Sequence, residues 1–272
     1  ACPQGRTSRL IQITSLAHLV VVVEVCPLEV PQVRLWSREQ IQAMRAVDVA
    51  TIVVCGVAGV EVGTEKAWDY CNKIKLPRNF FINKLDRENA SFDKTITQLK
   101  EKFGISVVPI QYPIGEGEEF RGVINVITKR ARIYNPTTKK MEPAEIPAEL
   151  IDKVNECKDM IIEAVAQTSE ELLDKFFNGV ELTDLELYEG LINGCTTGDI
   201  APVMCGSAIK AIGINTLLED IMECFPSPKY AIPQKAIEVD TDKEVFVKLE
   251  ENKPFSALVF KTIADPFVGK IS

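Results

Sequence analysis

Two short apolar segments, each followed by a helical pattern, constrain the fold of this chain more than any other feature. The segments are Ala50–Cys55 and Asn79–Ile82, both rich in β-branched or aromatic residues. Continuous apolar runs of this length are typical of strands that are buried on both faces. Helices are expected over 64–75 and 91–103, where apolar residues recur at helical spacing. Strand and helix in alternation indicate a mostly parallel sheet covered by helices, so the expected fold class is α/β.

The ends of the two helices carry local signals. Thr64 is expected to be the N-cap of the first helix, and Pro77 is expected to end it. Gly104 directly follows the second helix, which is typical of a helix C-terminus.

The pattern changes after residue 104. The next part of the chain contains short strand-like runs, a segment of turn residues and several helices. After it, an apolar strand followed by a helix occurs again. A capping-box pattern, Thr183-Asp-Leu-Glu186, opens one of these helices. The expected elements are strands at 106–111, 122–127 and 200–205, turns at 135–147, helices at 148–167, 169–177, 183–193 and 215–225, a polar linker at 230–253, and a half-buried strand at 255–263.

Composition limits the class of protein. With 272 residues, of which 46% are hydrophobic, the chain is long enough for one large domain or two smaller ones, each with a buried core. The formal charge is −8, from 31 Lys and Arg against 39 Asp and Glu. A protein that coats nucleic acid needs clustered positive charge, so we expect no DNA partner and only local contact with RNA.

The cysteines indicate a reducing compartment. The eight cysteines include no C-x-x-C pair and the chain has one histidine, so neither a zinc site nor a disulfide framework is expected. The longest apolar run, Leu16–Val23, contains His18 and is much shorter than the ~18 to 20 residues of a membrane span. We therefore expect no membrane partner, and we identify no signal peptide.

The motif Asn83-Lys84-Leu85-Asp86 directly follows an apolar strand and carries the strongest chemical signal. One carboxylate, from Asp86, can accept hydrogen bonds from both N1–H and the exocyclic amine of guanine. The Lys84 stem can cover the face of the purine, and the Asn83 amide can tie the loop to neighbouring backbone and touch the base edge. The alternative is a turn whose polar residues only cap the following helix.

A second loop, Gly206-Ser-Ala-Ile-Lys210, also follows an apolar strand. Ligands of open parallel sheets bind at the carboxyl ends of the strands, so the two loops are expected to share one crevice. There the Ala208 amide can donate to guanine O6, Ser207 can brace the Asp86 loop by hydrogen bonding, and Ile209 completes the base site. The alternative is an ordinary strand-to-helix connection.

With these two loops the sequence resembles the elongation factor G family of translational GTPases. The resemblance covers about residues 43–272 and includes Phe81-Ile-Asn-Lys-Leu-Asp-Arg87, Gly206-Ser-Ala-Ile-Lys210, Phe225-Pro-Ser-Pro228 and Ala264-Asp-Pro-Phe-Val-Gly269. Asp86 and Ser207 lie 121 positions apart (207 minus 86), whereas simple GTPases place these loops much closer. The family explains the gap by an α+β subdomain inserted in the G domain.

The resemblance implies a division of the chain. The expected parts are an atypical segment at 1–42, a truncated G domain at 43–103 and 200–228, the inserted subdomain at 104–199, and a linker with the first strands of a β-barrel domain at 229–272. The fold is thus expected to be that of a P-loop GTPase, incomplete at its N-terminal side.

The half of the site that would bind phosphate is not recognisable. The sequence contains no G-x-x-x-x-G-K-[ST] run, whose amides, Lys and hydroxyl hold the phosphates and Mg²⁺ in such enzymes. His18 to Val25 can be aligned with the family's His-to-Glu-Val segment, and 9–15 with its first switch, where Gln12 replaces the Mg²⁺-binding Thr; these alignments exclude one another. We assign no catalytic and no metal-binding residue, and interpret His18 as an ordinary histidine.

These observations lead to expectations about function. The resemblance implies a GTPase that binds GTP or GDP with Mg²⁺ and promotes movement of tRNA and mRNA on the ribosome, whose RNA and proteins are its partners. This chain alone is expected to be inactive. The alternatives are a non-catalytic guanine-site fragment or interaction module, and a ribosomal protection type of translational GTPase. A cytoplasmic location is expected, with a mitochondrial one as the alternative.

Overall fold

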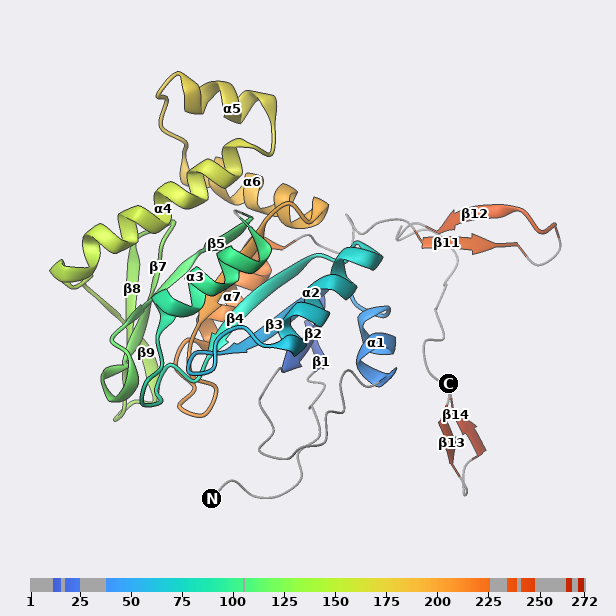
Figure 1. Ribbon diagram of the computed structural model, residues 1–272, viewed down its shortest axis with the longest axis horizontal. Helices are drawn as coiled ribbons and strands as arrows, with labels where there is room; N and C mark the ends of the chain where they lie inside the picture. Colours follow the sequence, from blue (N-terminus) through green and yellow to red (C-terminus); the bar gives the residue numbers. More distant parts are fainter. Residues whose placement is uncertain are drawn as a thin grey trace.

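A mostly parallel sheet forms the centre of the protein. The structure is a computed structural model that describes residues 12–15, 18–24, 38–104, 106–225, 234–238, 241–247, 263–265 and 269–271. Within these residues the large sheet has six strands in the order β1–β2–β3–β4–β10–β5 (Figure 1). They are β1 (Gln12–Ser15), β2 (His18–Glu24), β3 (Val49–Cys55), β4 (Arg78–Asn83), β10 (Ala201–Cys205) and β5 (Val107–Pro109).

The parallel direction of this sheet confirms the predicted fold class. The five strands β2, β3, β4, β10 and β5 are parallel to one another, and β1 is antiparallel to β2. Every residue of β3, β4 and β10 is buried, as expected for apolar runs that are covered on both faces. Most of the apolar run Leu16–Val23 lies in β2, and among the described residues no helix is long and apolar enough to span a membrane.

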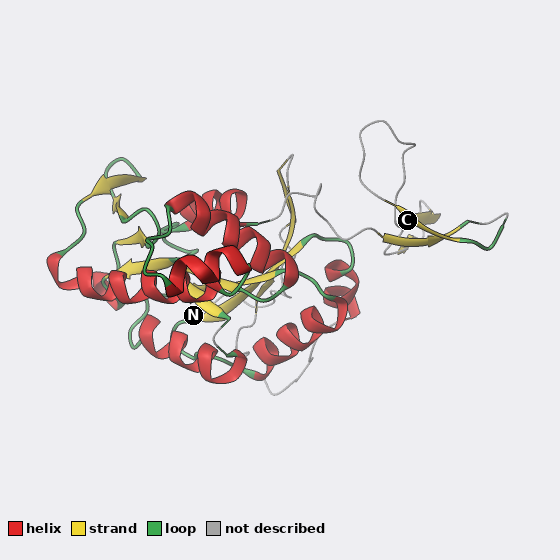
Figure 2. Ribbon diagram, turned by 90° about the horizontal axis from the view of Figure 1, so that it is seen from above, coloured by secondary structure: helices red, strands yellow, loops and turns green. Residues whose placement is uncertain are grey.

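Helices cover both faces of the sheet. α2 (Val62–Ile74) and α3 (Phe92–Phe103) lie on one face and α7 (Ile214–Cys224) on the other, and the view from above shows the sheet between them (Figure 2). A short helix, α1 (Arg38–Met44), precedes β3. The expected helices over 64–75, 91–103 and 215–225 are therefore confirmed, with their bounds shifted by one or two residues.

Three stacked aromatic rings join α2 and α3 to the sheet. The Trp68 ring lies 5.6 Å from that of Phe80 on β4 and 4.6 Å from that of Phe103 on α3, and Phe80 lies 5.5 Å from Phe103. The guanidinium of Arg78 lies 3.7 Å from the centroid of the Trp68 ring. Aromatic stacking adds to the free energy gained by burying these side chains.

The start of α2 differs from the prediction. Glu61, and not Thr64, is the N-cap, and Thr64 is the third residue of the helix. The Thr64 hydroxyl accepts a hydrogen bond from the Glu61 amide at 3.3 Å, so the threonine does satisfy an amide at this helix end. The predicted ends of α3 are confirmed: Ser91 caps the helix by accepting from Lys94 N, and Gly104 ends it.

A second sheet and three helices lie between β5 and β10 in the sequence. Within the described residues this sheet has four antiparallel strands in the order β6–β7–β8–β9. The elements are β6 (Gln111–Ile114), η1 (Gly117–Glu119), β7 (Gly122–Asn125), β8 (Arg130–Asn135), β9 (Lys140–Ala144), η2 (Ala148–Leu150), α4 (Ile151–Ala166), α5 (Glu170–Phe177) and α6 (Asp184–Thr197). The predicted helices of this region are confirmed, and α6 continues four residues beyond its expected end.

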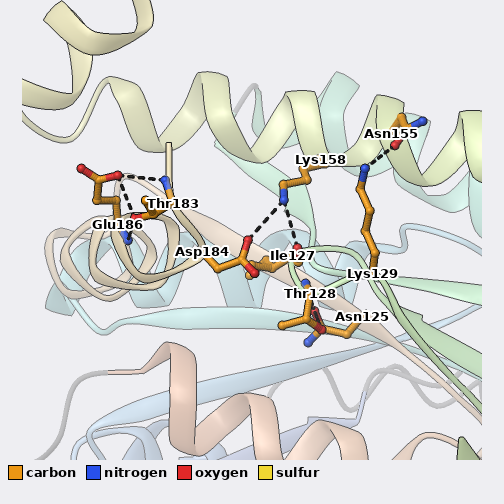
Figure 3. Close-up of polar contacts among 9 residues, drawn as sticks. All are labelled: Asn125, Ile127, Thr128, Lys129, Asn155, Lys158, Thr183, Asp184 and Glu186. Carbon is orange, nitrogen blue, oxygen red and sulfur yellow. Dashed lines mark hydrogen bonds and ion pairs between the residues drawn. The ribbon is translucent and has the colours of Figure 1, made fainter. Parts of the chain in front are cut away.

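Polar contacts hold α4 and α6 to the second sheet (Figure 3). The Lys158 ammonium on α4 donates to the Ile127 carbonyl at 3.1 Å and pairs with Asp184 at 3.2 Å. The predicted capping box of α6 is confirmed, because Glu186 accepts from the Thr183 amide at 2.8 Å and donates its own amide to the Thr183 hydroxyl at 3.3 Å. The start of α6 is therefore stabilised by its own capping box and by the ion pair with Lys158 of α4.

Three predictions of extended structure need correction. The run 106–111 is divided between two sheets: Val107–Pro109 pairs with β10 in the large sheet, although it falls in the range expected for the inserted subdomain, and Gln111 begins β6. The segment 135–147 contains β9, not turns alone. The expected linker 230–253 contains the hairpin of β11 (Gln234–Ile237) and β12 (Glu244–Val247).

The last predicted strand lies largely outside the described residues. Of 255–263, the structure describes Ile263, where β13 (Ile263–Asp265) begins and pairs with β14 (Gly269–Ile271). The expectation of a half-buried strand there stays a prediction.

A buried polar cluster joins the two sheets and α7. The Gln111 side chain on β6 donates to Asp220 of α7 at 2.5 Å and accepts from the Cys205 amide of β10 at 3.0 Å. Asn125 on β7 donates to the other Asp220 oxygen at 3.4 Å. Gln111 and Asp220 are 0% and 1% exposed, and this burial raises the pKa of Asp220 from 3.8 to about 7.

We expect Phe80→Ala to lower the free energy of unfolding by about 3–5 kcal/mol, because it removes a fully buried ring of the aromatic stack and leaves a cavity. Phe177→Ala is the matched control, since Phe177 is 77% exposed, and it should change stability by less than about 0.5 kcal/mol. Urea unfolding of the two variants measures both values. Equal losses would show that the stack does not dominate this core.

Asp220 should make stability depend on pH. Between pH 4 and 7 the folded state retains a proton that the unfolded state releases, so stability falls as pH rises through this window. From pH 5 to 8 we expect the wild-type chain to lose roughly 2 kcal/mol more than Asp220→Asn, whose side chain cannot ionise. Urea unfolding at both pH values measures the difference, with Glu189→Gln, an exposed carboxylate on α6, as control. A parallel pH response of wild type and Asp220→Asn would contradict the assignment.

Candidate functional site

Two loops leave the large sheet side by side at the carboxyl ends of neighbouring strands. β4 and β10 are parallel, with Ile82 opposite Cys205, so the loops that begin at Asn83 and Gly206 leave the same edge of the sheet. The Leu85 amide donates to the Gly206 carbonyl at 3.4 Å, which places the loops in direct contact. The structure therefore brings together the two segments that the sequence analysis selected.

The Asn83 side chain connects the two loops. Its Oδ1 accepts from the amide of Lys84 at 2.8 Å and from the amide of Ala208 at 3.0 Å. Asn83 is 9% exposed, so its amide group is largely removed from solvent. Asn83 therefore ties its loop to neighbouring backbone, as expected. Its contact with the edge of a base stays a prediction.

Lys84 and Asp86 lie in the loop that follows β4 and are half-buried. Lys84 has a φ of +66°, a backbone angle that residues other than glycine rarely adopt, so the loop turns sharply at this residue. Its ammonium lies near Glu61 at the start of α2. The pKa of Glu61 is raised, because the effect of desolvation exceeds the lowering by the Lys84 charge. Within the described part of the chain, no hydrogen bond or ion pair of the Asp86 carboxylate is observed, and its role in a base site stays a prediction.

Ser207 plays a different part from the one expected. Its side chain is 1% exposed, and its hydroxyl accepts from the Lys210 amide at 3.2 Å, within its own turn. Among the described hydrogen bonds, the two loops are joined by the contacts of Asn83 with Ala208 and of Leu85 with Gly206, and a brace from Ser207 to the Asp86 loop stays a prediction. Ser207 also pairs through its backbone with Ile212, which closes the second loop.

The Ala208 amide is already donated in this structure. Because its partner is Asn83 Oδ1, it could reach a base oxygen only by sharing the hydrogen bond or by a shift of the loop. The residue itself is exposed, and Ile209 next to it is 74% exposed. The face of this loop is therefore open to a ligand.

Two glycines permit the close approach of these loops. A Cβ atom on Gly206 would lie 2.5 Å from the Ile212 carbonyl oxygen and 2.9 Å from the Phe81 ring. A Cβ atom on Gly56, at the end of β3, would lie 3.0 Å from the Leu85 side chain, and the Gly56 amide donates to the Asn83 carbonyl at 2.8 Å. Gly56 was not among the predicted site residues, although a glycine directly after a buried strand can indicate a close approach of another segment.

Metal ligands are not assembled in the part of the chain that the structure describes. No group of three or more His, Cys, Asp or Glu side chains there is placed to hold an ion. His18 lies in β2, and its side chain is outside the described atoms. The sequence assigned no Mg²⁺ ligand to this chain, so no chemistry is derived through Mg²⁺.

Comparison with known families agrees with the geometry. Residues 31–227 match the family described as the elongation factor Tu GTP binding domain. The chain belongs to this family. The matched range contains both loops and the whole second sheet. It begins before Ala43, the residue at which the resemblance in the sequence starts.

A solved structure supports the same placement. A crystal structure of a protein from Thermus thermophilus is similar to this family member, with a TM-score of 0.69 and 30% sequence identity. The similarity covers 85% of this chain and 32% of the other, so this chain spans about a third of the length of that protein.

Asn83→Ala should separate the two loops of this GTP binding domain family member. Loss of Oδ1 leaves the Lys84 and Ala208 amides without their acceptor, so we expect faster hydrogen exchange at both amides and a loss of about 1–2 kcal/mol in stability. Asn83→Asp retains an acceptor oxygen and should keep the slower exchange. Exchange measured by NMR checks this, and unchanged rates in Asn83→Ala would contradict the role of the side chain.

Proposed function

We propose that this chain is part of a translation factor of the elongation factor G kind, which uses GTP to promote movement of tRNA and mRNA on the ribosome. The observation that carries the proposal is the pair of loops after β4 and β10, joined by Asn83 Oδ1 and the Ala208 amide at 3.0 Å. Membership of the elongation factor Tu GTP binding domain family supports a guanine nucleotide as the ligand.

The Asp86 carboxylate favours guanine over adenine. Both of its oxygens are acceptors, which match the N1–H and exocyclic amine of guanine, whereas adenine has an acceptor at N1. A site with this carboxylate discriminates strongly, because the wrong base leaves the carboxylate without its two donors. Lys84, whose ammonium lies near Glu61, would cover one face of the base with its aliphatic stem.

The second sheet and α4–α6 support a factor of the elongation factor G kind over a simple GTPase. They fill the sequence between the two base loops, and Asn83 and Ala208 are 125 positions apart. The tip of this region exposes Phe177, Val180 and Leu185, which are 77%, 52% and 68% exposed. We propose that ribosomal protein contacts use this region and that the protein acts in the cytoplasm, with a mitochondrial location as the alternative.

A non-catalytic guanine-binding module is the second candidate. The observation that favours it is the sequence itself, which has no G-x-x-x-x-G-K-[ST] run to hold phosphates. Contacts to the phosphates position the transferred group and stabilise its charge in phosphoryl transfer. On this view the chain binds the base weakly and does not hydrolyse GTP.

Titration with GDP, with and without Mg²⁺, tests these proposals. We expect weak binding that is selective against ADP, and no GTP hydrolysis by this chain alone. Asp86→Asn should lower GDP affinity by about ten- to a hundredfold and raise affinity for xanthosine diphosphate, whose C2 carbonyl accepts from an amide.

Glu88→Gln is the matched control, because Glu88 is an exposed acid in the same loop, and it should bind GDP like the wild-type chain. Equal binding of GDP and ADP would reject the guanine site. Submicromolar GDP affinity or measurable GTP hydrolysis would reject the non-catalytic module.

A further inference from the structure

The turn that follows β6 lies against the loop that contains Asp86. We call the segment Gly115–Glu119 the β6 turn. Its Gly117 amide donates to the carbonyl of Leu85 at 2.8 Å, and its Glu116 carboxylate accepts from the amide of Phe92 at 2.5 Å. Leu85 precedes Asp86 directly and Phe92 begins α3, so the β6 turn holds both ends of the segment that carries the base-reading carboxylate.

Glu116 provides an acceptor that the start of α3 lacks. The first amides of a helix have no partner inside the helix, and α3 has one N-cap, Ser91, which accepts from Lys94 N. The Phe92 amide is satisfied by Glu116, from a segment 24 positions further along the chain. A carboxylate at a helix N-terminus is also favoured by the helix dipole. Glu116 therefore fixes the place where the Asp86 loop ends.

Gln111, four positions before the β6 turn, holds the second base loop. β5 pairs with β10 as far as Pro109 and Val203, so the Cys205 amide lies beyond the end of its neighbouring strand. The Gln111 side chain accepts from that amide at 3.0 Å. Cys205 directly precedes the Gly206 loop, so β6 and its turn contact residues in or next to both base loops.

The shape of the β6 turn depends on its glycines. Gly115 has a φ of +77°, and a Cβ atom there would lie 2.2 Å from the Glu119 carbonyl oxygen; Gly117 has a φ of +62°. Other residues rarely adopt such backbone angles, so the sequence Gly-Glu-Gly allows the turn to bring Glu116 and the Gly117 amide to the Asp86 loop together. The motifs in the sequence do not assign this turn to the base site.

We propose that β6 and the β6 turn position the two base loops, and that Glu116 is a positioning residue for the Asp86 carboxylate. The inference rests on the proposed guanine site. It couples base recognition to the second sheet, because a shift of β6 relative to the large sheet moves the partners of Leu85, Phe92 and Cys205 together.

Glu116→Ala tests the inference. Without the carboxylate, the Asp86 loop should become mobile, and the preference for GDP over IDP should fall by about two- to tenfold, the range expected for one net hydrogen bond. IDP lacks the exocyclic amine, so the ratio of the two affinities reports the placement of Asp86. A general loss of stability would weaken both ligands equally and leave the ratio unchanged.

Two variants serve as controls. Glu116→Gln keeps an oxygen that accepts from Phe92 N and should restore most of the preference for GDP. Glu118→Ala removes an exposed acid from the same turn and should behave like the wild-type chain. Thermal unfolding of each variant shows whether it remains folded.

Hydrogen exchange gives a readout that needs no nucleotide. In Glu116→Ala the amides of 84–92 should exchange faster than in wild type, Glu116→Gln should restore slow exchange, and distant amides of α4 should be unaffected. Unchanged exchange at 84–92, or an unchanged GDP-to-IDP ratio, would overturn the inference. A wild-type chain without any preference for GDP would reject the proposed function instead, and the exchange data would still decide whether Glu116 positions the loop.

Discussion

The parallel pairing of β4 with β10 is the interaction on which the candidate site depends. These strands are distant in the chain, yet Ile82 lies opposite Cys205, and the loops that follow leave the sheet at the same edge. The contact between Asn83 Oδ1 and the Ala208 amide exists because of this register. A slip of one residue would turn the side chains of β10 to the opposite face and separate the loops.

Much of the large sheet could be predicted because its signals are local. The apolar runs that form β3 and β4 are short, fully buried and bounded by polar residues or glycine, and Ser91 with Gly104 marks α3 at both ends. β9 could not be predicted because none of its residues is buried, so its sequence lacks the apolar alternation of a strand. The run 106–111 resembles one strand, since an apolar sequence does not show where the chain passes from one sheet to another.

The candidate site also has a part that could be predicted from the sequence and a part that could not. Asn83, Lys84 and Asp86 were selected from a motif, and the structure places their loop beside Ser207 and Ala208. The hydrogen bonds of this region could not be predicted, because they depend on distances between segments far apart in sequence. Ser207 bonds within its own turn, whereas Gln111, a polar residue in an apolar run, proves to be completely buried between the sheets.

The way in which the second sheet is inserted determines how it could be removed. β5 and β10 are adjacent and parallel, so the end of one and the start of the other lie at opposite ends of the sheet. A hairpin cannot join them; a crossover of a dozen or more residues is required. α6, which is followed closely by β10, already has the length of such a crossover. The region can thus be understood as an enlarged strand–helix–strand unit, which could be trimmed back to one helix but not to a tight turn.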